Sequence, residues 1–228
     1  MSGFARVVHR ARDVAAARGF YTAVLGAHAI DMEIVPLPEA AAARGAPAHW
    51  LGAIGVDDVA RVRDQLVARA AQPLGPIQQD ARGAFASLRD AGGAAIALCS
   101  PSSTAPRPPI VWSHLDAHAA EATFATYSAL FGWQRTEAID LGAAGVVQQF
   151  AWQAGGPSVG SYADLATRPH HPMWIFHFRV ASLDAAANAV RTHGGVVLAE
   201  VTTPDKARVL VCDDPHAGGF ALRAEDRG

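Results

Sequence analysis

The sequence contains an internal repeat, and this repeat limits the folds that the chain can adopt. A shift of 124 residues brings together the pairs Trp50 and Trp174, Val56 and Val180, Asp90 and Asp214, Ala97 and Ala221, and Leu98 and Leu222. A second offset, of 106 residues, relates FYTAVLG at 20–26 to TYSALFG at 126–132. The chain therefore reads as four units, in the order A, B, A′ and B′, that share one structural pattern.

Each unit begins with a strand and continues into a helix. Asp13, Asp58 and Ser182 precede the predicted helices, and their short oxygen-bearing side chains are typical N-caps. The helices are expected to end at glycines, as a left-handed C-terminal cap prefers. In unit B′ three further strands follow, in the segments 194–201, 207–214 and 218–225. The predicted pattern is βαβββ, repeated four times in an α+β fold.

The repeat divides the chain into two modules. The N-terminal module is expected at 1–100, a Pro-rich linker at 101–109 and the C-terminal module at 110–228. Unit A is shortened, because the segment between Gly26 and Trp50 has room for one strand and a loop. The corresponding segment between Gly132 and Trp174 has room for three strands. We therefore expect the first half to be mainly scaffold.

Composition excludes several partner classes. The formal net charge is −2 without a basic run, which argues against nucleic acid, and no apolar segment is long enough to span a membrane. The two cysteines lack metal-site spacing and no secretion signal is visible, so a cytoplasmic location is expected. The oligomeric state is predicted to be a monomer or a homodimer.

The motifs resemble the vicinal oxygen chelate superfamily, which holds glyoxalase I, bleomycin-resistance proteins and extradiol dioxygenases. The resemblance rests on the strings FYTAVLG, YSALFGW, HWLGAIGVDDV and DPHAGGFAL, and it covers nearly the whole chain. It implies that pairs of βαβββ units curl mixed sheets into a cup that holds the ligand. In metal-using members of the superfamily, two His or Gln and one Glu bind a metal that chelates two neighbouring substrate oxygens.

The resemblance also implies where those metal ligands would lie. The corresponding positions are Arg6, Leu51, Trp112 and Ile175 on opening strands, and Ala97 and Ala221 on closing strands. None of these side chains has a donor for a divalent ion. If Asp116 rather than Ala119 starts the helix of unit A′, the position moves by three residues and still holds no strong donor. The sequence therefore predicts no cofactor and no metal at this place.

Polar residues stand instead on the opening strands of the second half. Strand side chains alternate, so positions seven, five and three before the helix share the face that lines the cup by family geometry. The predicted ligand-binding residues on this face are Trp112, His114, Asp116, His177 and Arg179. His114 and His177 are the candidate acids or bases, and Arg179 is a candidate clamp for a carboxylate or enolate oxygen. Alternatively, the histidines are packed strand residues, and Asp116 and Arg179 form a structural ion pair or one of these two points out to solvent.

Three functions remain open from the sequence. The first is a metal-independent binder that holds a small molecule in the C-terminal cup. The second is a lyase, isomerase or dioxygenase-type enzyme that uses His114 and His177 as acid and base, or as relocated ligands of zinc, iron or manganese. The third is a structural or partner protein whose cup has collapsed.

The remaining aromatic and histidine residues are expected to be structural. We expect Trp50 and Trp174 to fill the interface between paired units. Five histidines are predicted to be solvated or to cap loops: His9, His28, His118, His193 and His216.

Overall fold

The computed structural model describes residues 3–30, 32–101, 109–142, 145–165, 171–203 and 207–224. The first half forms a seven-stranded sheet in the order β2-β1-β3-β7-β6-β4, with β5 paired to β6. Its strands are β1 (Phe4–Ala11), β2 (Glu33–Pro36), β3 (His49–Gly55), β4 (Gln72–Pro73), β5 (Gln78–Asp80), β6 (Gly83–Arg89) and β7 (Ala95–Cys99). Its helices are α1 (Val14–Leu25), α2 (Glu39–Ala43) and α3 (Val59–Val67), with a 3-10 turn at Gly26–Ala29.

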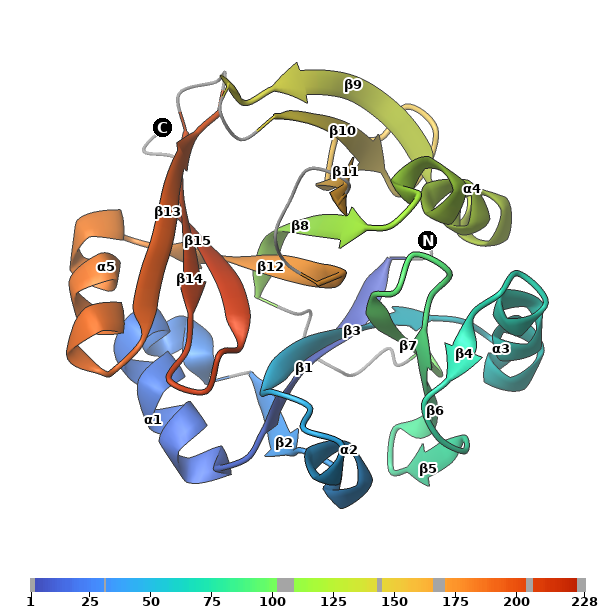
Figure 1. Ribbon diagram of the computed structural model, residues 1–228, viewed down its shortest axis with the longest axis horizontal. Helices are drawn as coiled ribbons and strands as arrows, with labels where there is room; N and C mark the ends of the chain where they lie inside the picture. Colours follow the sequence, from blue (N-terminus) through green and yellow to red (C-terminus); the bar gives the residue numbers. More distant parts are fainter. Residues whose placement is uncertain are drawn as a thin grey trace.

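The second half forms an eight-stranded sheet in the order β13-β14-β15-β12-β8-β11-β10-β9. Its strands are β8 (Ile110–Ala117), β9 (Gln134–Asp140), β10 (Val146–Ala151), β11 (Gly160–Asp164), β12 (Met173–Val180), β13 (Val196–Thr202), β14 (Arg208–Asp213) and β15 (Gly219–Ala224). Its helices are α4 (Ala120–Phe131) and α5 (Leu183–Thr192). Both sheets curl, with the large helices outside the curl (Figure 1). The predicted α+β fold of two curled mixed sheets is confirmed. Most of the predicted linker, residues 102–108, lies outside the described residues.

The opening strands of paired units lie side by side at the centre of each sheet. β1 pairs antiparallel with β3, and β8 pairs antiparallel with β12, which is the pairing that an internal twofold relation requires. The shortened unit A contributes only β2 and the short α2 where unit A′ contributes three strands, as its length predicts. The second sheet therefore continues past β11 into β10 and β9, whereas the first sheet, as described, ends at β2, which pairs parallel with β1 as β11 pairs with β8.

The predicted caps position the helices against these sheets. Asp13, Asp58 and Ser182 each accept a hydrogen bond from the backbone N–H three residues later, as predicted. Helix α4 begins after Ala119, which has a left-handed backbone with φ +45°, so the alternative start at Asp116 is wrong. Asp164, at the end of β11, instead accepts a bond of 3.2 Å from the Ala120 N–H.

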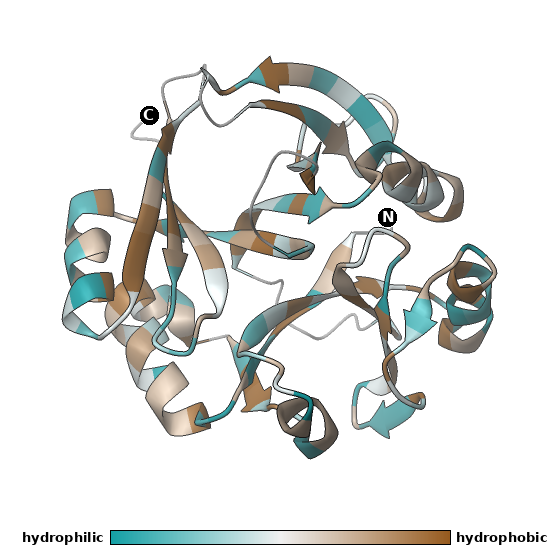
Figure 2. Ribbon diagram, in the orientation of Figure 1, coloured by the Kyte–Doolittle hydropathy of each residue, from teal (hydrophilic) through white to brown (hydrophobic). Residues whose placement is uncertain are grey.

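The helices are amphipathic and cover the convex side of the sheets. In α3 the buried residues Val59, Val62 and Leu66 follow a helical period. Teal and brown residues alternate around α3 and α5 in Figure 2, as expected of helices with one face on a sheet. The helices therefore do not cover the concave side of either sheet.

The two halves are joined by equivalent tyrosine and aspartate residues. The Tyr21 hydroxyl donates to Asp214 Oδ2 at 3.0 Å, and the Tyr127 hydroxyl donates to Asp90 Oδ2 at 2.6 Å. Each bond connects the first half of the chain to the second. Trp50, which donates its N–H to the Tyr21 hydroxyl, and Trp174 are both buried here, so the expected interface role of the two tryptophans is confirmed.

His9 corrects one expectation, because it is fully buried rather than solvated. Its Nε2 lies 2.9 Å from Asp214 Oδ2, and its ring packs against Tyr21 and Trp50. Strand alternation places His9 on the convex face of β1, and the pattern of β1 alone did not reveal that the other half of the molecule covers this face. Burial raises the pKa of Asp214, but His9 and two backbone N–H groups outweigh it and hold the pKa below its usual value.

Candidate functional site

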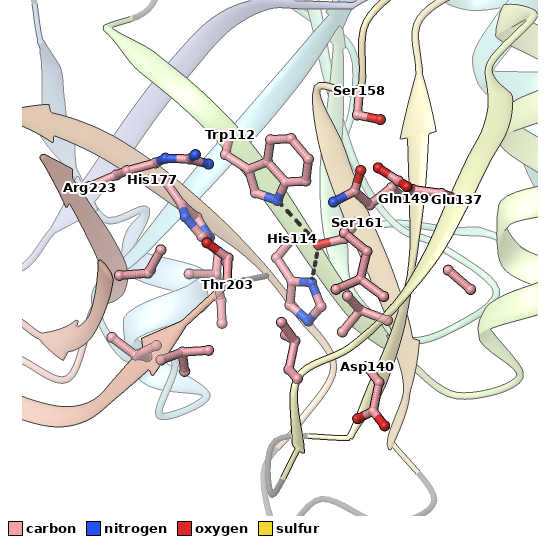
Figure 3. Close-up of a pocket in the computed structure, with 18 of the residues that line it drawn as sticks. Trp112, His114, Glu137, Asp140, Gln149, Ser158, Ser161, His177, Thr203 and Arg223 are labelled. Atoms are coloured by element: carbon pink, nitrogen blue, oxygen red, sulfur yellow. Dashed lines mark hydrogen bonds between the residues drawn. The ribbon is translucent and has the colours of Figure 1, made fainter. Parts of the chain in front are cut away.

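The concave face of the second sheet encloses a cavity of about 920 Å³. All eight strands of this sheet contribute to the wall (Figure 3). The polar lining residues are Trp112, His114, Asp116, Glu137, Asp140, Gln149, Ser158, Ser161, His177, Thr203 and Arg223, and the apolar ones are Ala138, Ile139, Leu141, Val147, Ile175, Val201, Val209 and Val211. A cavity of this size and mixed lining suits a small organic molecule.

Three of the predicted residues, from β8, join a hydrogen-bonded chain with Ser161 of β11. Trp112 Nε1 donates to Ser161 Oγ at 3.2 Å, and His114 Nδ1 lies 2.8 Å from the same oxygen. His114 Nε2 lies 3.2 Å from Asp116 Oδ1. Figure 3 shows the two bonds that meet at Ser161. His114, Asp116 and Ser161 are all buried, with 8%, 1% and 5% of their surface exposed.

The direction of each hydrogen bond in this series follows from which groups can donate and which can only accept. Indole N–H can only donate, so Ser161 Oγ accepts from Trp112. A carboxylate can only accept, so a neutral His114 carries its hydrogen on Nε2 and donates to Asp116. Nδ1 of His114 is then the acceptor for the Ser161 hydroxyl. The chain runs in one direction, from Trp112 through Ser161 and His114 to Asp116.

His177, on β12, has a different environment. Burial is the main cause that lowers the pKa of His177 to about 3, with smaller electrostatic contributions from the neighbouring His114 and Arg223. The ring is therefore neutral at ordinary pH. Its Nδ1 is enclosed and has no hydrogen-bond partner among the described residues. A neutral imidazole that lines a cavity can form a hydrogen bond with a polar group of a ligand through a ring nitrogen that the cavity exposes, which the enclosed Nδ1 is not.

The second half places the cationic residue of the cup on a different strand from the predicted one. Arg179 is exposed and is not among the residues that line the cavity, and the described ion pairs do not include one between Asp116 and Arg179. Arg223, which lies opposite Arg179 on β15, lines the cavity instead.

Ser161 and Gln149 also line the cavity and were not predicted from the sequence. Ser161 lies opposite His114 in the sheet register, as Ala221 lies opposite His177, so Ser161 occupies the equivalent of a closing-strand position in unit A′. An alignment of the closing strands of A′ and B′ would have identified it. Gln149 lies opposite Ser161 on β10, where neighbouring side chains on one face come into contact range. Both residues therefore belong to one row across the cup wall.

The residues at the superfamily's metal positions do not fit a divalent ion. In the second sheet these positions hold Trp112, whose only polar atom donates to Ser161, the hydrocarbon Ile175 and the methyl group of Ala221. Within the described ranges, no three His, Cys, Asp or Glu residues form a group that could hold a metal. His114 could become a ligand only by giving up one of its two ring hydrogen bonds.

The equivalent face of the first sheet is filled by side chains. Phe85 is 4% exposed and packs in a cluster with Leu51, Ala53, Ala97 and Cys99. The guanidinium of Arg6 covers its ring at 4.9 Å. Arg6 also donates to Glu33 at 2.6 Å and to Asp80 at 3.2 Å. These contacts support the expectation that this half is scaffold.

Comparison with known proteins gives a consistent set of relatives. No family model matches the chain. "Putative glyoxylase CFP32" of Mycobacterium bovis and of Mycobacterium tuberculosis is 28% identical to it over 201 residues, which cover 83% of this chain and 74% of the relative. In the described part of the chain, no helix is long and apolar enough to cross a membrane.

Solved structures share the arrangement of both sheets. Homoprotocatechuate 2,3-dioxygenase from Brevibacterium fuscum matches with a TM-score of 0.64 and 11% identity, over 98% of this chain and 80% of that one. The Mn(II)-bound glyoxalase from Novosphingobium aromaticivorans matches with a TM-score of 0.61 and 12% identity, over 99% and 83%. A mutant of 4-hydroxymandelate synthase from Streptomyces coelicolor matches with a TM-score of 0.60 and 14% identity, over 100% and 94%. These matches confirm the predicted resemblance at the level of the fold.

Proposed function

From the two-module fold that it shares with the vicinal oxygen chelate superfamily, we infer that this protein binds a small organic molecule in the C-terminal cup without a metal held by the protein. The observation that carries this proposal is the cavity of about 920 Å³, walled by every strand of the second sheet. The cup is open where the equivalent face of the first sheet is filled. A collapsed cup would not leave this space.

The lining supports a ligand with an apolar body and a few polar groups. Ile139, Val147, Val209 and Val211 offer apolar contact from β9, β10 and β14. Arg223 brings a positive charge, and His177 brings a neutral imidazole ring. We therefore expect an anionic or strongly polarised oxygen of the ligand to face β12 and β15, with its apolar body toward β9, β10 and β14.

This chain does not have metal-ligating side chains at the positions where the resemblance places them. The alternative, in which His114 and His177 hold a relocated zinc, iron or manganese ion, needs His114 to leave Ser161 or Asp116. Even then the two histidines supply two ligand atoms, which is fewer than protein sites for these metals use. Binding that does not depend on metal is therefore the proposal that the side chains support.

A thermal-shift screen of small aromatic and carboxylate compounds tests this proposal, with and without EDTA. We expect at least one compound to raise the melting temperature equally in both conditions, because a ligand that binds only the folded state stabilises it. Val209→Phe should weaken binding by about tenfold or more by placing a ring in the ligand space, as Phe85 does at the repeat position. Val196→Phe is the matched control, since Val196 is 52% exposed on β13 and lies outside the lining.

Two results would overturn the proposal. One is the absence of a shift from any compound in a screen that includes both aromatic carboxylates and neutral aromatics. The other is binding that disappears with EDTA and returns with a stoichiometric divalent ion measured in the purified protein.

A further inference from the structure

We propose that Ser161 is a nucleophile, activated by His114 and Asp116, and that the cup can transfer acyl groups from small carboxylic esters. The observation behind this proposal is geometric: Ser161 Oγ lies 2.8 Å from His114 Nδ1, and His114 Nε2 lies 3.2 Å from Asp116 Oδ1. With His114 neutral, these contacts form the one-way chain in which Ser161 donates to His114 and His114 donates to Asp116. A serine, an imidazole and a buried carboxylate in this order form the arrangement of serine hydrolases, whatever the fold that carries it.

The ring nitrogens are exchanged relative to the common form of this arrangement. Here Nδ1 faces the serine and Nε2 faces the carboxylate, but the roles depend on hydrogen-bond partners and not on the labels. The neutral tautomer required for catalysis is the one that Asp116 and Trp112 impose. Asp116 is 1% exposed, so its charge acts on the ring with little screening by water.

The surroundings of Ser161 suit an attack on a carbonyl carbon. Ser161 lines the cavity, and one lone pair of its oxygen is used by the Trp112 N–H. The other lone pair is left for the new bond. The Trp112 N–H also stabilises negative charge that develops on this oxygen. The Gln149 side chain, from the neighbouring position on β10, can donate to the carbonyl oxygen as it becomes negative.

The reaction balances with water as the only co-reactant. The Ser161 Oγ–H bond breaks, its proton moves to His114 Nδ1, and a bond forms between Oγ and the carbonyl carbon of the ester. The bond from that carbon to the leaving oxygen then breaks, and the leaving alcohol or phenol takes the proton from His114. Water next attacks the acyl carbon while His114 takes one of its protons, the bond from that carbon to Oγ breaks, and the ring returns the proton to Ser161 Oγ as the carboxylic acid leaves. The net reaction is ester plus water to acid plus alcohol.

Labelling with diisopropyl fluorophosphate tests the nucleophile directly. We expect one diisopropylphosphoryl group per chain, located on Ser161 by peptide mass mapping, with loss of fluoride. Ser161→Ala should remove the adduct. Ser113→Ala is the matched control, because Ser113 is a buried serine on the same strand as His114 but outside the cavity lining, and its hydroxyl has no partner among the described residues. It should label like the natural protein.

The other two members of the chain are tested by the rate of labelling and by hydrolysis of p-nitrophenyl acetate. Loss of the base in His114→Ala should slow both by about 100-fold or more. Asp116 acts through His114 as a positioning residue, so Asp116→Asn should lower kcat by a similar factor with little change in KM. If His114→Ala fails to fold, the Asp116→Asn variant and the Ser161→Ala comparison still decide the question.

The proposal would be overturned if the natural protein formed no adduct with diisopropyl fluorophosphate. It would also be overturned if Ser161→Ala still formed the adduct. Its failure is distinguishable from failure of the proposed binding function. Compounds that shift the melting temperature of both the natural protein and Ser161→Ala would show an intact binding cup without a nucleophile.

Discussion

The two sheets of this protein present the same concave face with different contents. Repeat positions that line the second cup are occupied in the first by residues that fill it or cover it: Val209 corresponds to Phe85, Arg223 to Cys99, His177 to Ala53, His114 to Val8, and Trp112 to Arg6. The backbone is shared, so these side chains decide which face is open. In the part of the chain that the structure describes, the first sheet ends at β2, the counterpart of β11, and strands equivalent to β9 and β10 are absent, so this sheet lacks part of the wall that a cup would need.

The same duplicated unit has a filled concave face in the first half and an open, polar-lined one in the second. In the first sheet, the space is occupied by Phe85 and closed by Arg6, which is held by carboxylates of β2 and β5. This face stabilises the fold through burial. In the second sheet, polar residues line the space and form bonds within the wall. Substitutions at matching positions should therefore change stability in the first half and binding in the second.

The largest expected effect on stability comes from Phe85→Ala. The ring is buried, and its removal leaves a cavity beneath Arg6, so the free energy of unfolding should fall by about 3 kcal/mol. Val209→Ala, at the matching position, should cost about 1 kcal/mol, because its side chain faces space that is already open. Urea unfolding of both variants checks this difference. Equal losses would mean that the two faces are packed alike.

A second prediction concerns His177, whose counterpart in the first cup is Ala53. An unfolded chain protonates this ring near pH 6.5, whereas in the folded protein its pKa lies at about 3. Between these values the unfolded state binds more protons, so stability falls as the pH falls. From pH 7 to pH 5 the natural protein should lose about 2 kcal/mol more than His177→Ala. Urea unfolding at both pH values measures this.

The comparison between those two proteins isolates His177 from other groups. Burial also lowers the pKa of His49, but His49 is present in both proteins and contributes equally. The same loss of stability in the natural protein and in His177→Ala would mean that the ring is hydrated in the cup and titrates normally.

Much of this fold was predictable because the repeat, the caps and the strand alternation are local signals. Asp13, Asp58 and Ser182 identified their helices directly. Ala119, which precedes helix α4, has no capping side chain. The first turn of α4 is capped instead by Asp164, which is 45 residues away from Ala119 in the chain. That contact depends on the sheet register, and the local pattern of residues 116–120 does not contain it.

The site was predictable only on the opening strands. Trp112, His114, Asp116 and His177 followed from alternation, and all four line the cavity. Arg179 obeys the same alternation but is exposed, and its register partner Arg223 lines the cavity instead. Ser161 and Gln149 were missed because they come from strands whose register with β8 only the folded sheet defines. His9 was misjudged for a related reason, since the other module buries it.

A third prediction tests what closes the first cup. Arg6 lies over Phe85, and its side chain is only 10% exposed between Glu33 and Asp80. Arg6→Ala should lower the free energy of unfolding by about 1.5 kcal/mol, because it uncovers the ring and leaves the Glu33 carboxylate with a single partner. Arg6→Met, which keeps the apolar cover, should recover part of this loss. No difference between the two variants would show that only the charge matters.

The smallest effect is expected at Arg82, which joins the same group of charges from outside. It contacts Glu33 at 2.7 Å, but its side chain is 45% exposed, and water screens the interaction. Arg82→Ala should therefore cost about 0.5 kcal/mol at low salt and less at about 1 M salt. Urea unfolding at the two salt concentrations checks this, with Arg63→Ala as a control for a charge pair away from the cup. A loss as large as that of Arg6→Ala would mean that the rim charges, and not the cover over Phe85, keep the first face closed.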